Sequence, residues 1–342
     1  MLAPFRNVRK CYRAVRPAAW HGLLLSMAVA GGGAGAAEPA TSSSLQTDAP
    51  ASTLPEGLAW DPTRGRFLLS SIRDQRILTV DPRNGHSAVF AKTRGSLLGM
   101  HPDPDGKRLW AAYTRFSANN EINDGTGLML YDLAGGTLLG DWPLPNAAGS
   151  SVLGDLLVLG DGSLITTDSV AGGVYRFDPK PHRYTTLVPP GNLKSPQGIA
   201  PGIQAGTVVF ADYATGLWEL SLATRSRRLL AAPEGVELRG IDGLYRVGAS
   251  LVAVQNGTQT PRVLWIRLVE AGVGQVTPLA EGRAGWDGPA LGVVRGNEFW
   301  LVANGQWDRF GPHFELPTAF ALKRPLLDRV LLPKPEGALS RP

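Results

Sequence analysis

Short apolar segments alternate with tight polar turns along most of the chain. A typical stretch is "GDLLVLGDGSLITTD", residues 154–168, in which two apolar segments flank a Gly-Asp-Gly turn. No long segment repeats apolar residues at the three- and four-residue spacing of an amphipathic helix. The pattern therefore predicts many short strands, and the 42 glycines and 27 prolines supply the tight connections that such strands need.

One unit of apolar segments recurs six times. Each copy opens with a polar or small residue followed by an apolar strand, a tight turn and a second strand. The six copies begin "EGLAWDP" at 56, "LGMHPDP" at 98, "GDLLVLG" at 154, "QGIAPGI" at 197, "DGLYRVG" at 242 and "LGVVRGN" at 291. This repeat predicts an all-β fold, a six-bladed β-propeller with four antiparallel strands per blade. A β-sandwich does not need six registered copies, and a TIM barrel needs helices that this sequence does not offer.

The first 37 residues have a different composition. Five basic residues precede an apolar run at 23–30, and small residues follow at 36 and 37. This order is typical of a secretory signal peptide, which predicts a periplasmic or secreted protein. Residues 38–53, rich in Ser, Thr, Ala and Pro, are expected to be a disordered linker. The propeller is expected at 54–333 and a C-terminal tail at 334–342.

The charge of the chain is concentrated in that leader. The formal net charge is +5, and the leader holds five basic residues and no acidic one, so 5 − 5 leaves the remainder near neutral. The basic balance therefore does not indicate a nucleic-acid partner. The single cysteine, Cys11, also lies in the leader, so no disulfide is expected after its removal. We expect a monomer that acts on a small molecule and has no membrane association once the signal is cleaved.

The residues that open the six copies are expected to meet in the central channel, since the first strand of each blade lines the axis of a propeller. In chain order these residues are Glu56, Leu98, Gly154, Gln197, Asp242 and Leu291. Two carboxylates and a carboxamide in a confined channel repel each other or lose solvation unless a cation or proton lies between them. Oxygen ligands suit a hard divalent ion, with Ca²⁺ favoured and Mg²⁺, Mn²⁺ or Zn²⁺ as alternatives. The other interpretation is that these side chains bond backbone amides at the channel mouth.

A second ring of polar residues ends the second strands of four copies: Asp168, Asp212, Asn256 and Asn304. Such residues are common in turns, and that interpretation is favoured for the ring as a whole. Asn256 and Asn304, together with Asp155, are nevertheless candidates for contacting a substrate. A polar insertion at 113–127 is expected to be a long loop whose role the sequence does not reveal. The histidines lack zinc-site spacing, and no nucleophile elbow or phosphate-binding loop occurs in a suitable setting.

These segments resemble the regucalcin/gluconolactonase family of six-bladed propellers. The resemblance depends on "PEGLAWDP", "SPQGIA", "GIDGLYRVGASLVAVQNG" and "VANGQWDRF". It implies one divalent cation held at the channel mouth by a Glu, an Asn and an Asp, and hydrolysis of sugar lactones or related esters. Glu56 and Asp242 match the family's glutamate and aspartate. Gln197 replaces the usual asparagine, Gly154-Asp155 stands where the family has Asn-Asp, and Val152 occupies the place of a substrate-holding arginine.

The sequence as a whole predicts an exported, metal-dependent hydrolase of a lactone or ester less polar than a sugar lactone. Glu56, Gln197 and Asp242 would bind the metal, and Asp242 would also act as the catalytic residue that orients or deprotonates the attacking water. The alternative is a non-catalytic propeller that binds a small ligand or a protein partner at the channel mouth.

Overall fold

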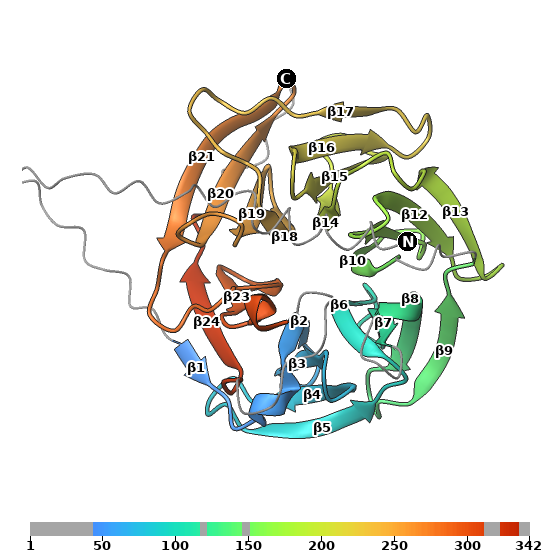
Figure 1. Cartoon of the computed structure of the whole chain (residues 1–342), viewed down its shortest axis with the longest axis vertical. Helices are drawn as coiled ribbons and strands as arrows, with labels where there is room; N and C mark the ends of the chain where they lie inside the picture. The colour runs from blue at the N-terminus through green and yellow to red at the C-terminus, as the bar shows by residue number, and fades with distance from the viewer. Residues whose placement is uncertain (1–43, 117–121, 146–150, 311–321, 335–342) are drawn as a thin grey trace, which may run out of the picture.

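Six four-stranded antiparallel sheets surround a central axis in the computed structural model, which describes residues 44–116, 122–145, 151–310 and 322–334 (Figure 1). The prediction of an all-β, six-bladed propeller is therefore confirmed. The predicted signal peptide at 1–37 and nearly all of the predicted tail at 334–342 lie outside the described residues. Within these ranges, no helix is long and apolar enough to cross a membrane.

The first three blades follow the chain without interruption. Blade 1 contains β2 (Pro55–Asp61), β3 (Arg66–Ser71), β4 (Arg76–Val80) and β5 (Ser87–Lys92). Blade 2 contains β6 (Ser96–Pro102), β7 (Arg108–Phe116), β8 (Ile122–Asp132) and β9 (Leu138–Pro143). Blade 3 contains β10 (Leu153–Val158), β11 (Leu164–Asp168), β12 (Gly173–Asp178) and β13 (Arg183–Val188).

The last three blades complete the ring. Blade 4 contains β14 (Pro196–Pro201), β15 (Thr207–Asp212), β16 (Gly216–Ser221) and β17 (Arg227–Leu229). Blade 5 contains β18 (Ile241–Val247), β19 (Ser250–Gln255), β20 (Arg262–Val269) and β21 (Gly272–Glu281). Blade 6 contains β22 (Gly292–Arg295), β23 (Glu298–Val302), β24 (Leu326–Leu331) and β1 (Ser44–Gln46).

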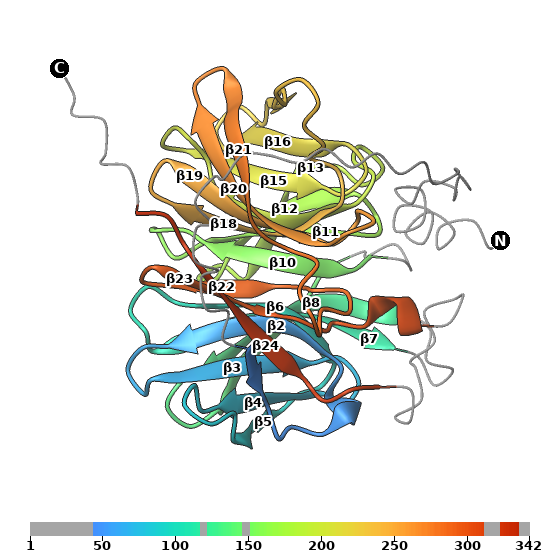
Figure 2. The ribbon, with the colours of Figure 1, turned by 90° about the vertical axis from the view of Figure 1, so that its left-hand side faces the viewer.

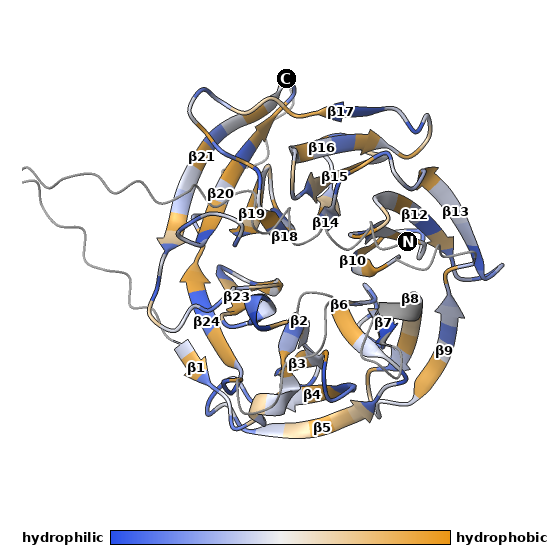
Figure 3. Cartoon of the chain, viewed as in Figure 1, coloured by the Kyte–Doolittle hydropathy of each residue, from blue (hydrophilic) through white to orange (hydrophobic). Residues whose placement is uncertain are grey.

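The core of the protein lies between blades, where buried apolar side chains of neighbouring sheets pack together. Apolar residues recur along the strands around the ring (Figure 3). At the junction of blades 6 and 1, the ring of Phe67 lies 5.0 Å from that of Trp60 and 5.1 Å from that of Trp300. Such contacts bury apolar area that a single sheet would expose, so each blade depends on its two neighbours.

The innermost strand of five blades contains a β-bulge at the same position. The register of β2, β6, β10, β14 and β18 against the next strand shifts there, between Pro55 and Leu58 in β2 and at the equivalent place in the others. Neighbouring inner strands approach closely at the bulge, because an added Cβ on Gly57 would lie 2.1 Å from the carbonyl oxygen of Leu98. A bulge re-aims the side chains beside it, so this ring decides which residues face the axis.

The expectation of a disordered linker is wrong for its second half. β1 pairs with β24 as the fourth strand of blade 6, and Ala51–Thr53 forms a 3-10 turn. Because the sixth copy begins at 291 and the propeller was expected to begin at 54, the sequence predicted that all four strands of this blade follow residue 291. Pairing with β24 satisfies backbone groups that a free linker would leave to water, and it joins the two ends of the ring (Figures 1 and 2).

The polar insertion at 113–127 also differs from the expected loop. β7 and β8 pair as one long hairpin that continues to Phe116 and Ile122. The intervening residues 117–121 lie outside the described part of the chain. Polar composition indicated a loop, but an edge that projects beyond the core can be polar and still complete its backbone hydrogen bonds.

Candidate functional site

The bulges lie in the inner strands of blades 1, 4 and 5, and they contain the three predicted metal ligands. Glu56 lies in the bulge of β2, Gln197 in that of β14 and Asp242 in that of β18. All three side chains are buried, with relative exposures of 5%, 8% and 3%. The six-fold repeat was therefore a correct guide to their equivalent positions, although whether they bind a metal stays a prediction.

Two of the buried carboxyl groups interact electrostatically. Burial raises the pKa of Glu56 well above its usual value, and the charge of Asp242 raises it further. Burial likewise raises the pKa of Asp242 to about 6. Neither carboxylate forms an ion pair with a basic side chain within the described ranges. Like charges in such a site carry a cost that a cation or a shared proton removes.

Each candidate ligand is held by a second group through one of its polar atoms. The indole N–H of Trp307 donates to Oε2 of Glu56. Nδ2 of Asn256 donates to Oδ2 of Asp242 at 2.7 Å, and Nε2 of Gln197 donates to Oγ of Ser195 at 3.0 Å. One further oxygen of each ligand receives no hydrogen bond from any described residue. Outer groups that orient ligands in this way are typical of metal sites.

The donor set fits a hard cation only with added water. No group of three or more His, Cys, Asp or Glu side chains in the described parts of the chain is arranged to hold a metal. Two carboxylates and the Gln197 amide would therefore supply three oxygens, fewer than the six to eight that Ca²⁺ takes. The residues present suit an oxygen-bound ion that keeps several waters, and they do not suit a sulfur- or histidine-rich zinc site.

Comparison with solved structures identifies propellers of similar architecture. Regucalcin of Agrobacterium tumefaciens, described as a calcium-binding protein, has a TM-score of 0.58 and 15% identity over 85% of this chain and 95% of its own. A gluconolactonase of Xanthomonas campestris has a TM-score of 0.55 and 15% identity over 86% and 90%. The PQQ-bound aldose sugar dehydrogenase of Streptomyces coelicolor has a TM-score of 0.55 and 16% identity over 86% and 99%.

This chain shares their fold. Regucalcin and gluconolactonase propellers are thus among its structural neighbours, as the motif resemblance predicted. No protein-family model matches the sequence, and no curated protein sequence matches it either. Because enzymes as different as a lactonase and a dehydrogenase share this architecture, only the residues of the site can decide the chemistry.

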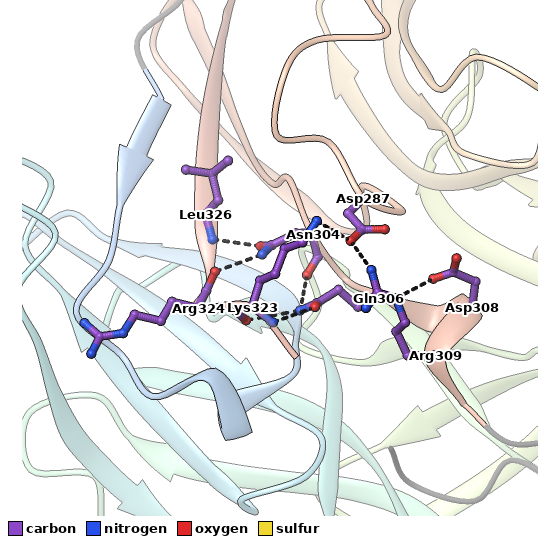
Figure 4. A network of polar contacts seen from close by, with 8 residues as sticks. All are labelled: Asp287, Asn304, Gln306, Asp308, Arg309, Lys323, Arg324 and Leu326. Carbon is purple, nitrogen blue, oxygen red and sulfur yellow. Dashed lines mark hydrogen bonds and ion pairs between the residues drawn. The ribbon is translucent and has the colours of Figure 1, made fainter. Parts of the chain in front are cut away.

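Two of the predicted substrate-binding residues are engaged by the protein itself. Asn256 donates to both Asp242 and the carbonyl of Pro289, and its oxygen accepts from the hydroxyl of Tyr213. Asn304 donates to the carbonyl of Arg324 at 2.8 Å and accepts from the amide of Leu326 at 2.8 Å (Figure 4). These contacts give Asn256 a positioning role beside Asp242 and Asn304 a structural role. They lend no support to direct substrate contact.

The two aspartates of the same ring act in turns, as favoured from the sequence. Oδ1 of Asp168 accepts from the amides of Val152 and Ala171, both at 2.9 Å. Oδ2 of Asp212 accepts from the amide of Lys194 at 2.7 Å. Both residues therefore hold the loops that lead into the blades.

Trp307 makes a contact with Glu56 that the sequence did not reveal. It begins the short 3-10 helix η2 (Trp307–Arg309), and its ring stacks on that of Phe310 at 4.7 Å. The network around this helix fixes its position: Arg309 pairs with Asp287 at 2.8 Å, and the side chain of Gln306 accepts from the amide of Lys323 (Figure 4). Only the fold could bring Trp307 to Glu56, since 251 residues separate them.

Asp155 lies where four other inner strands have the bulge glycine and β22 has Gly292. Its Oδ1 fills the space over Gly99, 2.4 Å from where a Cβ on that glycine would lie, and Oδ2 accepts from the amide of Ile199 at 3.4 Å. Burial raises its pKa to about 7, with a smaller contribution from the charge of Asp242. The side chain therefore bridges three blades, and its predicted contact with substrate stays a prediction.

We expect Asp155→Asn to remove a pH dependence of stability. The folded carboxyl binds its proton up to about pH 7, whereas an unfolded one loses it near 3.8, so the folded state binds more protons between these values. The wild-type free energy of unfolding should therefore fall, relative to the variant, by about 4 kcal/mol or less as the pH rises through that window. Urea unfolding at pH 4 and pH 8 in EDTA measures this, with Asp308→Asn at an exposed carboxylate as the control. A constant difference between wild type and Asp155→Asn would contradict the prediction.

Proposed function

We propose that this protein is an exported, monomeric hydrolase that cleaves a lactone or ester with the help of one divalent cation. The carrying observation is the buried pair Glu56 and Asp242, whose mutual repulsion no basic side chain in the described residues relieves. Gln197 would be the third protein ligand, with Ca²⁺ the expected ion. The shared fold of regucalcin, described as a calcium-binding protein, and of gluconolactonase supports the proposal.

The cation would polarise the substrate carbonyl and stabilise the negative charge that develops on its oxygen. Asp242, held by Asn256, is oriented to accept a proton from the attacking water. The amide nitrogen of Gln197 donates a hydrogen bond to Ser195, so the side-chain carbonyl oxygen of Gln197 remains available to bind the cation. Trp307 holds Glu56 from the opposite side.

The surroundings favour a substrate less polar than a sugar lactone. An apolar group that we call the mouth cluster comprises Leu54, Ile72, Leu98, Val152, Phe310 and Leu322, with Trp307 packed against it. Leu98 is the blade 2 counterpart of Glu56, and the side chain of Val152 offers no hydrogen bond at the place where the regucalcin/gluconolactonase family has an arginine. The mouth cluster would favour alkyl groups of a substrate, because its apolar side chains offer no hydrogen bonds to the hydroxyls of a sugar.

The alternative, a non-catalytic binding module, is favoured by one contact. The indole of Trp307 donates to Oε2 of Glu56, and its ring also stacks on that of Phe310. A protein that only binds a ligand would not need to clear that position for each turnover.

Thermal melting and a substrate panel test the proposal. After EDTA treatment, saturating Ca²⁺ should raise the melting temperature by several degrees, since an ion at about 100 times its Kd adds about 2.7 kcal/mol. Mg²⁺, Mn²⁺ and Zn²⁺ serve as comparisons. Alkyl-substituted lactones should be hydrolysed at least about tenfold faster than gluconolactone, which lacks an apolar group. A melting shift without turnover would favour the binding module, and no shift with any ion would refute the metal site.

A further inference from the structure

The central channel contains a cavity of about 500 Å³. Its walls come from the part of each inner strand that follows the bulge, so it lies further along the strands than Glu56 and Asp242. Apolar side chains from all six blades form most of the lining, among them Leu58, Met100, Leu156, Ile199, Leu244 and Val293. The cavity is therefore a second concave space, with a composition typical of sites for small organic molecules.

One positive charge in this lining has no counter-charge. Nε of Arg246 donates to the carbonyl of Gly248 at 2.6 Å, whereas Nη1 is shielded from water and finds no acceptor among the described residues. No carboxylate in the described ranges lies within ion-pair distance of this guanidinium. Desolvation lowers the pKa of Arg246, and no nearby anion offsets the effect. A buried donor without a partner carries a cost that a bound acceptor would remove.

The other ionisable groups in the lining do not balance Arg246. Asp103 pairs with Arg108 and accepts from the indole of Trp110 at 2.8 Å. Asp155 is held by the backbone amide of Ile199. Nδ1 of His101 donates to the carbonyl of Pro102 at 2.8 Å, and burial lowers the pKa of this histidine, so its ring adds no second positive charge. The cavity thus presents a single unneutralised cation on an apolar wall.

We propose that this cavity is a second binding site, which accepts an organic monocarboxylate with an apolar body and pairs its carboxylate with Arg246. A guanidinium binds a carboxylate through charge-assisted hydrogen bonds, and a rotation of the Arg246 side chain toward the cavity would give Nη1 the acceptor that it lacks. At about 30 Å³ for each water-sized group, the volume accommodates a ligand of about ten to fifteen non-hydrogen atoms. A medium-chain fatty acid or an arylalkanoic acid meets both requirements. The proposal does not depend on the metal site.

Calorimetric titration of the purified protein with octanoate, in EDTA, tests this site. Octanoate should bind to the wild type, while acetate, which lacks the apolar body, and 1-octanol, which lacks the charge, should bind at least tenfold more weakly. Arg246→Met should weaken octanoate binding at least tenfold, and Arg246→Lys should weaken it less because the charge remains. Arg267→Met, at an exposed arginine of β20 in the same blade, serves as the matched control and should bind octanoate as the wild type does.

A cavity-filling variant keeps the test independent of the arginine. Val293→Trp should block octanoate without changing any charge, and circular dichroism melting shows whether each variant is folded. Equal octanoate affinity in wild type and Arg246→Met would overturn the proposal. Binding of 1-octanol as tight as that of octanoate would show an apolar cavity only, and equal binding of acetate would show a site for any small anion. Either result also overturns it.

Discussion

A chain that begins at Leu54 should lose about 5 kcal/mol or more of its folding free energy relative to a chain that begins at Ser44. The ten residues that differ contain β1 and the 3-10 turn, which join blade 6 to blade 1. β1 pairs with β24 through three residues, and Oγ1 of Thr47 donates to the carbonyl of Pro325 at 2.9 Å. At about 1 kcal/mol for each hydrogen bond, these contacts amount to a large part of a typical stability of 5–15 kcal/mol.

The same segment also reaches blade 1. The carboxylate of Asp48 accepts from the amide and hydroxyl of Ser87, at 2.7 and 2.6 Å, and contacts Nδ1 of His86. Ala49 is fully buried in the core that blades 6 and 1 share. The loss of residues 44–53 should therefore separate blade 6 from blade 1 and not simply shorten one sheet.

Urea unfolding of the two truncated chains measures this effect. The chain from Ser44 should unfold at the same urea concentration as the full protein, which makes it the control for removal of the preceding residues. The chain from Leu54 should unfold at a much lower concentration or fail to accumulate in soluble form. Equal midpoints for the two would mean that the ring closes without β1.

Asp242→Asn should abolish the melting shift caused by the divalent cation and lower lactone or ester hydrolysis at least about a hundredfold. The amide keeps the oxygen that Asn256 binds but removes the negative charge and the proton acceptor. Because burial raises the pKa of the folded carboxyl from its ordinary value of 3.8 to about 6, its ionised form destabilises the metal-free protein above pH 6. Without metal at pH 8, the variant should therefore be more stable than the wild type, by about 3 kcal/mol at most.

Opposite effects on stability and activity separate a metal ligand from a structural residue. If Asp242 were merely structural, its substitution would lower the free energy of unfolding of the protein at all pH values, with or without the cation. Asp308→Asn, at an exposed carboxylate in η2, is the control and should change neither the cation response nor the rate. A cation-dependent melting shift of wild-type size in Asp242→Asn would exclude Asp242 as a ligand.

The sequence could predict that Glu56, Gln197 and Asp242 occupy equivalent positions around the axis, because each is the first residue of a copy of the repeat. The alternation of apolar strands and glycine-containing turns is local information, and quasi-symmetry converts it into positions around an axis. The same logic located the aspartates that hold turns, Asp168 and Asp212. The repeat did not predict what each residue contacts. Asn256 and Asn304 were candidates for contacting a substrate, but their side chains form hydrogen bonds within the protein.

The strand that closes the ring could not be predicted in this way. "SLQ" at 44–46 is short and partly polar, and nothing in its own pattern distinguishes it from a linker. It becomes a strand because β24 presents an unpaired edge to it from a point more than 270 residues away along the chain. Long-range pairing of this kind overrides local composition.

The amino-acid sequence by itself determined the number of blades, the order of the strands in the first five and the ring of residues that opens each inner strand, because these follow from periodicity and turn chemistry. Only the tertiary structure decided which partner each polar group finds. The indole of Trp307 reaches Glu56 across 251 residues, the amide of Asn256 reaches Asp242 from the end of the adjacent strand, and Nη1 of Arg246 finds no acceptor among the described residues. Burial and charge depend on that three-dimensional arrangement, so the electrostatics of the site appear only once the ring is closed.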